Sequence, residues 1–130
     1  MNFCEKLKQS EFFRAMKGAE EREIAEAEKE LSISFAPEYK DFLQKYGVAS
    51  IKGHEFFGLG SSKRLDVVYN TKQLRADNNI MGKDCYAVEA TGMDGIVIVQ
   101  NYSGKVFEVK SGKKPMLLCN SLEEYITKYQ

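Results

Sequence analysis

The chain has 130 residues, a length that suits one domain with a single core, and we expect that domain to span residues 1–130. Its 19 basic and 19 acidic residues cancel and form no basic stripe, so direct binding of nucleic acid is not expected. The longest apolar run, residues 96–99, is too short to span a bilayer, and the first residues lack the apolar stretch of a signal peptide, so we expect a cytoplasmic protein without membrane contact.

Helical patterns dominate the first half of the sequence. Residues 3–9 suit a short helix, whereas residues 12–19 suit a less regular connection. Residues 20–31 carry glutamates in their first turn, where carboxylates favour the positive end of the helix dipole, and apolar residues then recur at helical spacing. We therefore predict a helix with one apolar face over this segment. The apolar positions are Ile24, Ala27 and Leu31.

Residues 37–47, PEYKDFLQKYG, predict the clearest helix of the chain. Pro37 suits the first helical position because the amide hydrogen that proline lacks would be unpaired there. Gly47 suits the residue that ends a helix in a left-handed conformation. The apolar residues between them form one stripe, which we expect to be buried against a sheet. They are Tyr39, Phe42, Leu43 and Tyr46.

The second half is predicted mostly as strands. Short segments rich in β-branched and aromatic residues favour strands at 53–60, 85–90, 96–100, 105–110 and 116–119. Turns are predicted at 92–95 and 101–104, and a helix is predicted at 65–79. Residues 121–129 favour a final helix, with Ser121 and Glu124 as a capping box. Helices, then antiparallel strands, then a helix indicate an α+β fold.

The sequence offers no recognisable catalytic constellation. His54 is the only histidine, and its neighbour Glu55 would point to the opposite face of a strand, so the two are not placed for proton relay. Residues 58–64, GLGSSKR, lack the spacing of a phosphate-binding glycine loop. We therefore expect no catalytic residue, no cofactor and no enzyme activity.

The three cysteines, Cys4, Cys85 and Cys119, lie far apart in the sequence. They form no CxxC pair, and with a single histidine they do not give the close spacing of a structural zinc site. We expect free thiols in a reducing compartment, with no bound metal and no disulfide.

The order of these segments resembles the SUKH superfamily, which includes fungal regulators of cell-wall synthesis and many bacterial immunity proteins. The resemblance covers nearly the whole chain, although Ala36-Pro37 stands where the family helix often starts with leucine-proline. The resembling segments are residues 17–31, 35–47, 53–60, 66–75, 90–109 and 120–126.

The resemblance implies a SUKH-like fold of about six mostly antiparallel strands, with helices packed at the N-terminal side and a C-terminal helix. It also implies an immunity protein, because many bacterial members resemble antidotes encoded beside polymorphic toxins, often nucleases, that they neutralise by binding without catalysis. The expected partner is thus a cognate toxin domain. A regulatory scaffold for an endogenous protein is the alternative, and a ligand binder would need a pocket with convergent polar groups.

Three glutamates are our candidate partner contacts. Glu23, Glu26 and Glu30 share about one quadrant of the helix predicted at 20–31, away from much of its apolar face. Such a carboxylate stripe can imitate a nucleic-acid backbone and meet the basic cleft of a nuclease. A solvated helix face would give the same pattern. If that is what the stripe is, the loops at 61–64 and 92–95 are the next candidates.

Overall fold

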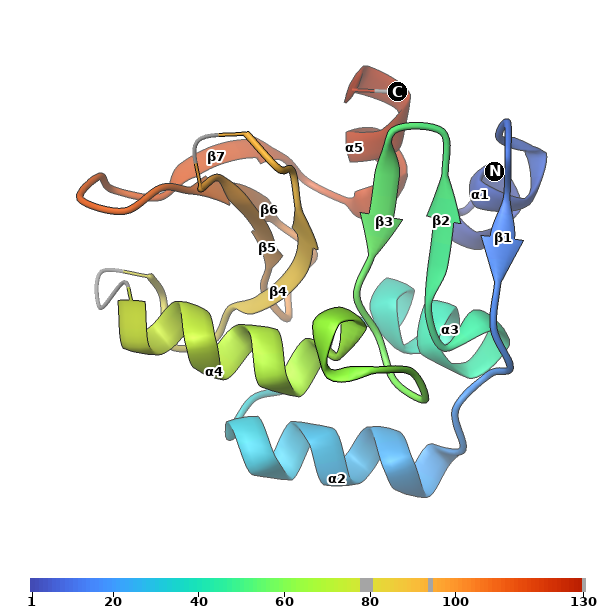
Figure 1. The fold of residues 1–130 in the computed structure, drawn as a ribbon, viewed down its shortest axis with the longest axis horizontal. Coiled ribbons are helices and arrows are strands. Elements are labelled where there is room, and N and C mark those ends of the chain that lie inside the picture. Colours follow the sequence, from blue (N-terminus) through green and yellow to red (C-terminus); the bar gives the residue numbers. More distant parts are fainter. Residues whose placement is uncertain (78–80, 94, 130) are drawn as a thin grey trace.

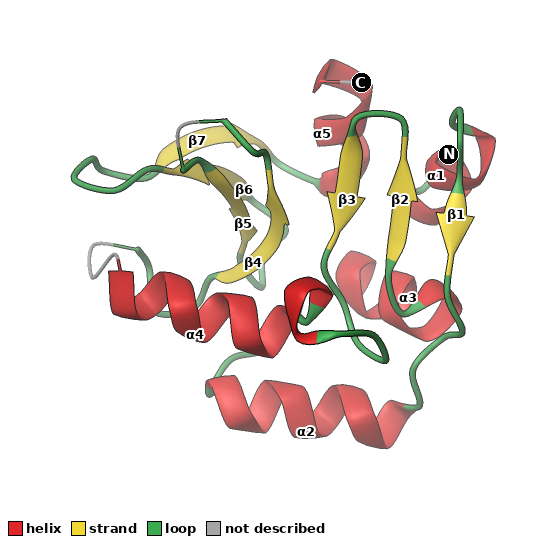
Figure 2. Cartoon of the chain, viewed as in Figure 1, coloured by secondary structure: helices red, strands yellow, loops and turns green. Residues whose placement is uncertain are grey.

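The computed structural model describes residues 1–77, 81–93 and 95–129. Figures 1 and 2 show its helices and strands. The helices are α1 (Phe3–Gln9), α2 (Glu21–Leu31), α3 (Pro37–Tyr46), the short 3-10 helix η1 (Lys63–Leu65), α4 (Val67–Asp77) and α5 (Leu122–Tyr129). The strands are β1 (Arg14–Ala15), β2 (Ala49–Ile51), β3 (His54–Phe56), β4 (Tyr86–Ala90), β5 (Val97–Gln100), β6 (Val106–Val109) and β7 (Met116–Cys119). The α+β class predicted from the sequence is confirmed.

The strands form one antiparallel sheet whose spatial order follows the chain from β1 to β7. β3 and β4 share a single registered pair, Phe56 with Glu89. The register of β4 against β5 also shifts between Ala87 and Glu89. An irregularity of this kind bends a strand and increases its twist. The sheet consequently turns at this point, and Figure 1 shows β4–β7 curling away from the flatter β1–β3.

The helices cover the sheet unevenly. α1 contacts α3 and α5, and Figure 1 shows these three helices behind β1–β3. α4 lies against β4, where the Thr71 hydroxyl accepts a hydrogen bond from the Ala87 amide, and α2 packs on α4 and α3. No helix in the described ranges is both long and apolar enough to cross a membrane.

α3 supplies the centre of the core, as its sequence pattern predicts. Tyr39, Phe42 and Leu43 are fully buried, whereas Tyr46 is only half-buried and directs its hydroxyl to the Cys4 carbonyl. Gly47 ends the helix with a φ of 72°. A Cβ at Gly47 would also lie 2.5 Å from the Lys17 carbonyl oxygen, so the position excludes larger residues on two grounds.

α5 is anchored at its start by α3. The Ser121 hydroxyl accepts the predicted bond from the Glu124 amide at 3.0 Å, but the Glu124 carboxylate accepts from the Asn120 amide instead of closing the predicted box. The two oxygens of Glu38 accept the next amides, from Leu122 at 2.8 Å and Glu123 at 2.9 Å. A carboxylate from another helix thus satisfies free amides at the positive end of α5.

Two strands were not predicted. β1 has two residues, in a segment expected to be irregular, and β2 has three residues, in a stretch to which no element was assigned. Segments this short carry too little periodicity to register as strands. They exist because β1 pairs with β2 and β2 pairs with β3. The strand predicted at 53–60 is shorter than expected, because only His54–Phe56 form β3, and the helix predicted at 65–79 begins at Val67. The remaining predicted helices and strands are confirmed to within one residue at each end. Residues 78–79 of the helix at 65–79 and Asp94 of the turn at 92–95 lie outside the described residues.

Candidate functional site

One row of side chains crosses five neighbouring strands. Phe56 pairs with Glu89, Glu89 with Ile98, Ile98 with Glu108, and Glu108 with Met116. Residues directly opposite each other in antiparallel strands point to the same face of the sheet. Phe56 is buried beneath the helices at one end of this row. Towards its other end the row continues along β4–β7, where the carboxylates of Glu89 and Glu108 project from the face that carries α5.

An open cavity of about 740 Å³ occupies this face. The sheet forms one side, α5 forms another, and the ends of the β2–β3 and β4–β5 hairpins form the rim. A volume of this size lies within the range of sites that take small molecules or parts of a larger partner. Among its lining residues are Glu89, Ile98, Glu108, Leu118, Tyr125 and Tyr129.

His54 is held by two acceptors at the inner end of the cavity. Its Nδ1 lies 2.7 Å from the Glu89 carboxylate, and its Nε2 lies 3.0 Å from the backbone carbonyl of Tyr129. A carboxylate and a carbonyl can only accept, so both ring nitrogens must donate for both bonds to form. The hydrogen bond that His54 donates to Glu89 raises the pKa of His54, and burial opposes this shift. The geometry therefore favours the imidazolium form.

The same carboxylate also binds α5. Glu89 is 2% exposed, and its second oxygen accepts a hydrogen bond from the Tyr125 hydroxyl at 2.5 Å. Burial, followed by the nearby Glu89 charge, raises the pKa of Tyr125, which keeps that hydroxyl protonated as a donor. The His54 ring stacks on Phe56 and meets Tyr125 edge-on, each with ring centres 5.8 Å apart. We call the half-buried His54 and the buried Glu89 and Tyr125 the buried triad; it joins β3, β4 and α5.

The buried triad is arranged for structure and binding more than for proton transfer. Both nitrogens of His54 are occupied, and both oxygens of Glu89 are hydrogen-bonded. A general base needs a lone pair directed at the proton that it removes. The rest of the cavity pairs apolar walls with a carboxylate, a surface suited to binding another molecule. Within the described residues, no three His, Cys, Asp or Glu side chains come close enough to hold a metal ion.

Stability should fall as pH rises through the folded pKa of His54. That pKa is raised above 6.5, so the stabilisation is fully present below about 6.5. It is lost above the folded value, when the ring gives up one of its two bonds. We expect urea unfolding at increasing pH to show this loss in the wild type and not in His54→Gln. Because this is the only histidine, its ring signals in NMR report the folded pKa directly. Parallel stability curves for the two proteins would contradict the assignment.

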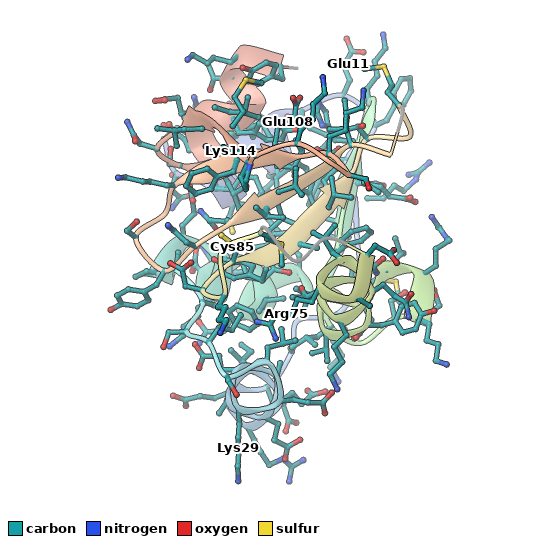
Figure 3. All side chains as sticks on the ribbon, turned by 90° about the vertical axis from the view of Figure 1, so that its left-hand side faces the viewer. Glu11, Lys29, Arg75, Cys85, Glu108 and Lys114 are labelled. Carbon is teal, nitrogen blue, oxygen red and sulfur yellow. The ribbon has the colours of Figure 1, made fainter. Side chains whose placement is uncertain are left out.

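The predicted glutamate stripe lies elsewhere. Glu23, Glu26 and Glu30 are all exposed on α2. Glu23 accepts the Glu20 amide at 2.9 Å, which caps the helix, and Glu30 pairs with Lys72 at 2.8 Å. Glu26 has no partner among the described residues. Figure 3 labels Lys29 of α2 at one end of the molecule and Glu108 towards the other, so the helix that carries the stripe lies far from the cavity.

The expectation for His54 and Glu55 is confirmed, since they point to opposite faces. The Arg64 guanidinium donates two hydrogen bonds to the Glu55 carboxylate, at 2.7 and 3.1 Å, in a bidentate ion pair, while His54 lines the cavity. The partner of His54 was missed. The one available signal was Glu89 itself, a carboxylate within the apolar strand segment CYAVEA, because a charge buried among such residues needs a partner.

The three cysteines are unbridged and buried. Burial is the main cause that raises the pKa of Cys4 and of Cys85, each to about 12, and it also raises the pKa of Cys119. Thiols that stay protonated at neutral pH are poor nucleophiles. These residues therefore serve packing in the core.

The whole chain can be compared with known proteins. A family model described as SMI1-KNR4 cell-wall, SUKH_5, matches residues 1–129. A search of the curated proteins found no match. The seven-stranded antiparallel sheet with its C-terminal helix agrees with the fold implied by the sequence resemblance. The chain belongs to the SMI1-KNR4 cell-wall family, within the SUKH superfamily.

Proposed function

We propose that the protein is a cytoplasmic immunity protein that binds a cognate polymorphic toxin, a nuclease, and neutralises it by occlusion without catalysis. The family includes toxin-immunity proteins. The observation that carries the proposal is the open cavity with apolar walls, whose one histidine has both nitrogens engaged by the protein itself. That arrangement supports binding and leaves the histidine without a free lone pair for proton transfer.

The contact surface is part of the proposal. Glu26 is the member of the glutamate stripe best suited to meet a basic cleft, because Glu23 caps α2 and Glu30 already pairs with Lys72. Reversing all three charges would therefore disturb the helix as well as any interface. Changing Glu26 alone separates the two effects.

Binding and protection can be tested with the toxin domain encoded by the neighbouring gene. We expect one-to-one binding in calorimetric titration and survival of cells that express both proteins. If the stripe contacts the toxin, Glu26→Lys should weaken binding and slow association, and the effect should shrink at high salt, because exposed charges are screened beyond about 8 Å at physiological ionic strength. Asp77→Lys, an exposed reversal on α4, is the matched control.

Each outcome has a distinct meaning. Failure of the wild type to bind or to protect would contradict the immunity role for this pair and favour the alternative, a regulatory scaffold for an endogenous partner. Unchanged binding by folded Glu26→Lys would remove only the glutamate stripe from the interface. Loss of binding in both Glu26→Lys and Asp77→Lys would indicate a general charge effect.

A further inference from the structure

We propose that the cavity beside α5 binds a basic side chain, lysine or arginine, that the protein partner presents on an apolar segment, with the Glu108 carboxylate as its counter-charge. This inference rests on the proposed function in one respect: the partner is taken to be the toxin domain. It places the main recognition at the opposite end of the molecule from the glutamate stripe (Figure 3).

Among the described charged residues that line the cavity, one carboxylate has no ion-pair partner. Glu11 pairs with Lys52 at 3.4 Å on the rim, and His54 pairs with Glu89 at 2.7 Å at the inner end. Glu108 forms no ion pair with any residue of the described ranges. Of the three lining carboxylates that the structure describes, two are therefore neutralised within the protein, and the third, Glu108, gives the cavity a local negative charge. An anionic ligand such as a phosphate would be repelled.

The position of Glu108 places its carboxylate between apolar side chains of the sheet. It is half-buried in the middle of β6, and its direct neighbours across the sheet are Ile98 and Met116. Two apolar neighbours cannot solvate a carboxylate or donate hydrogen bonds to it. A charge partly removed from water is stabilised when an opposite charge approaches, particularly one that also donates hydrogen bonds. A bound cation would supply the opposite charge and the hydrogen-bond donors that these neighbours lack, which is the reason to expect selection by charge.

The walls suit the rest of a long basic side chain. Ile96, Ile98 and Leu118 provide an apolar lining against which the methylene stem of lysine or arginine can pack. Met93 is 65% exposed and Tyr129 is 48% exposed at the rim. Methionine adapts its shape to a partner, and a tyrosine ring attracts cations at its face. A cavity of about 740 Å³ also has room for apolar residues that flank the basic one.

Short peptides test this recognition without a toxin. The probe is acetyl-Leu-Arg-Leu-amide, and its control is acetyl-Leu-Gln-Leu-amide, which keeps the apolar flanks and lacks the charge. We expect the arginine peptide to shift the NMR methyl signals of Ile96, Ile98 and Met93, and the glutamine peptide to shift them much less. Glu108→Gln should abolish the difference between the peptides. Glu21→Gln, the same change at an exposed site on α2, should retain it.

The toxin provides an independent measurement. If the wild type binds the toxin domain, Glu108→Gln should weaken that binding about tenfold, the order expected for one charged hydrogen bond, whereas Glu21→Gln should not. Thermal unfolding verifies that both variants are folded. Equal responses to the two peptides, no response to either, or unchanged toxin binding by folded Glu108→Gln would overturn the inference. If the wild type binds the arginine peptide selectively but does not bind the toxin domain, the cavity assignment is supported and only the proposed function is contradicted.

Discussion

Replacing Phe42 with alanine should lower the free energy of unfolding by ~3–5 kcal/mol, the usual cost of removing a fully buried phenylalanine ring. The Phe42 side chain has 0% exposure. Its ring centre lies 5.5 Å from that of Phe3 on α1, 5.6 Å from that of Tyr39 and 6.4 Å from that of Phe56 on β3. Truncation would leave a cavity where two helices meet the sheet, and aromatic rings packed on several sides cannot collapse into it.

Urea unfolding measures this loss, and the same helix supplies a control. Gln44 is exposed two residues further along α3. Gln44→Ala should change stability by less than about 0.5 kcal/mol, so a large effect at Phe42 alone reports the buried ring and not the helix itself. A loss below about 1 kcal/mol for Phe42→Ala would contradict the central place of this ring in the core.

Replacing Glu89 with alanine should cost ~3–5 kcal/mol near neutral pH, the range found when one partner of a buried ion pair is removed. Both oxygens of Glu89 are engaged, by His54 at 2.7 Å and by Tyr125 at 2.5 Å. The variant would leave the half-buried imidazolium with the Tyr129 carbonyl as its one remaining acceptor, and it would remove the acceptor of the buried Tyr125 hydroxyl. It would also remove the main cause that raises the pKa of His54, so that pKa should fall.

A neighbouring carboxylate gives the control for this change. Glu55 also forms an ion pair, with Arg64 at 2.7 Å, but both side chains are largely exposed. Glu55→Ala should cost no more than about 1 kcal/mol, as is usual for exposed pairs. Similar losses for the two variants would contradict a special role for the buried triad, and so would an unchanged NMR titration of His54 in Glu89→Ala.

Much of the fold could be predicted from patterns of residues within single helices and strands. The 3.6-residue spacing of Tyr39, Phe42 and Leu43 fixes which side of α3 must be buried, and Pro37 and Gly47 set its ends through their own backbone preferences. The strands from β4 to β7 were also recognisable, because β-branched and aromatic residues gather in short runs between turns. Each of these signals lies within a few residues of the element that it predicts.

The tertiary structure alone decided the site. β1 and β2 exist only because a neighbouring strand pairs with each of them. Glu89 meets His54 and Tyr125, 35 and 36 residues away, through the single registered pair that joins β3 to β4 and the packing of α5. The sequence determined which residues are charged and which faces are apolar. Register and packing between segments far apart in the chain decide which carboxylates are neutralised and leave Glu108 without a described counter-charge. No local pattern in the sequence encodes those contacts.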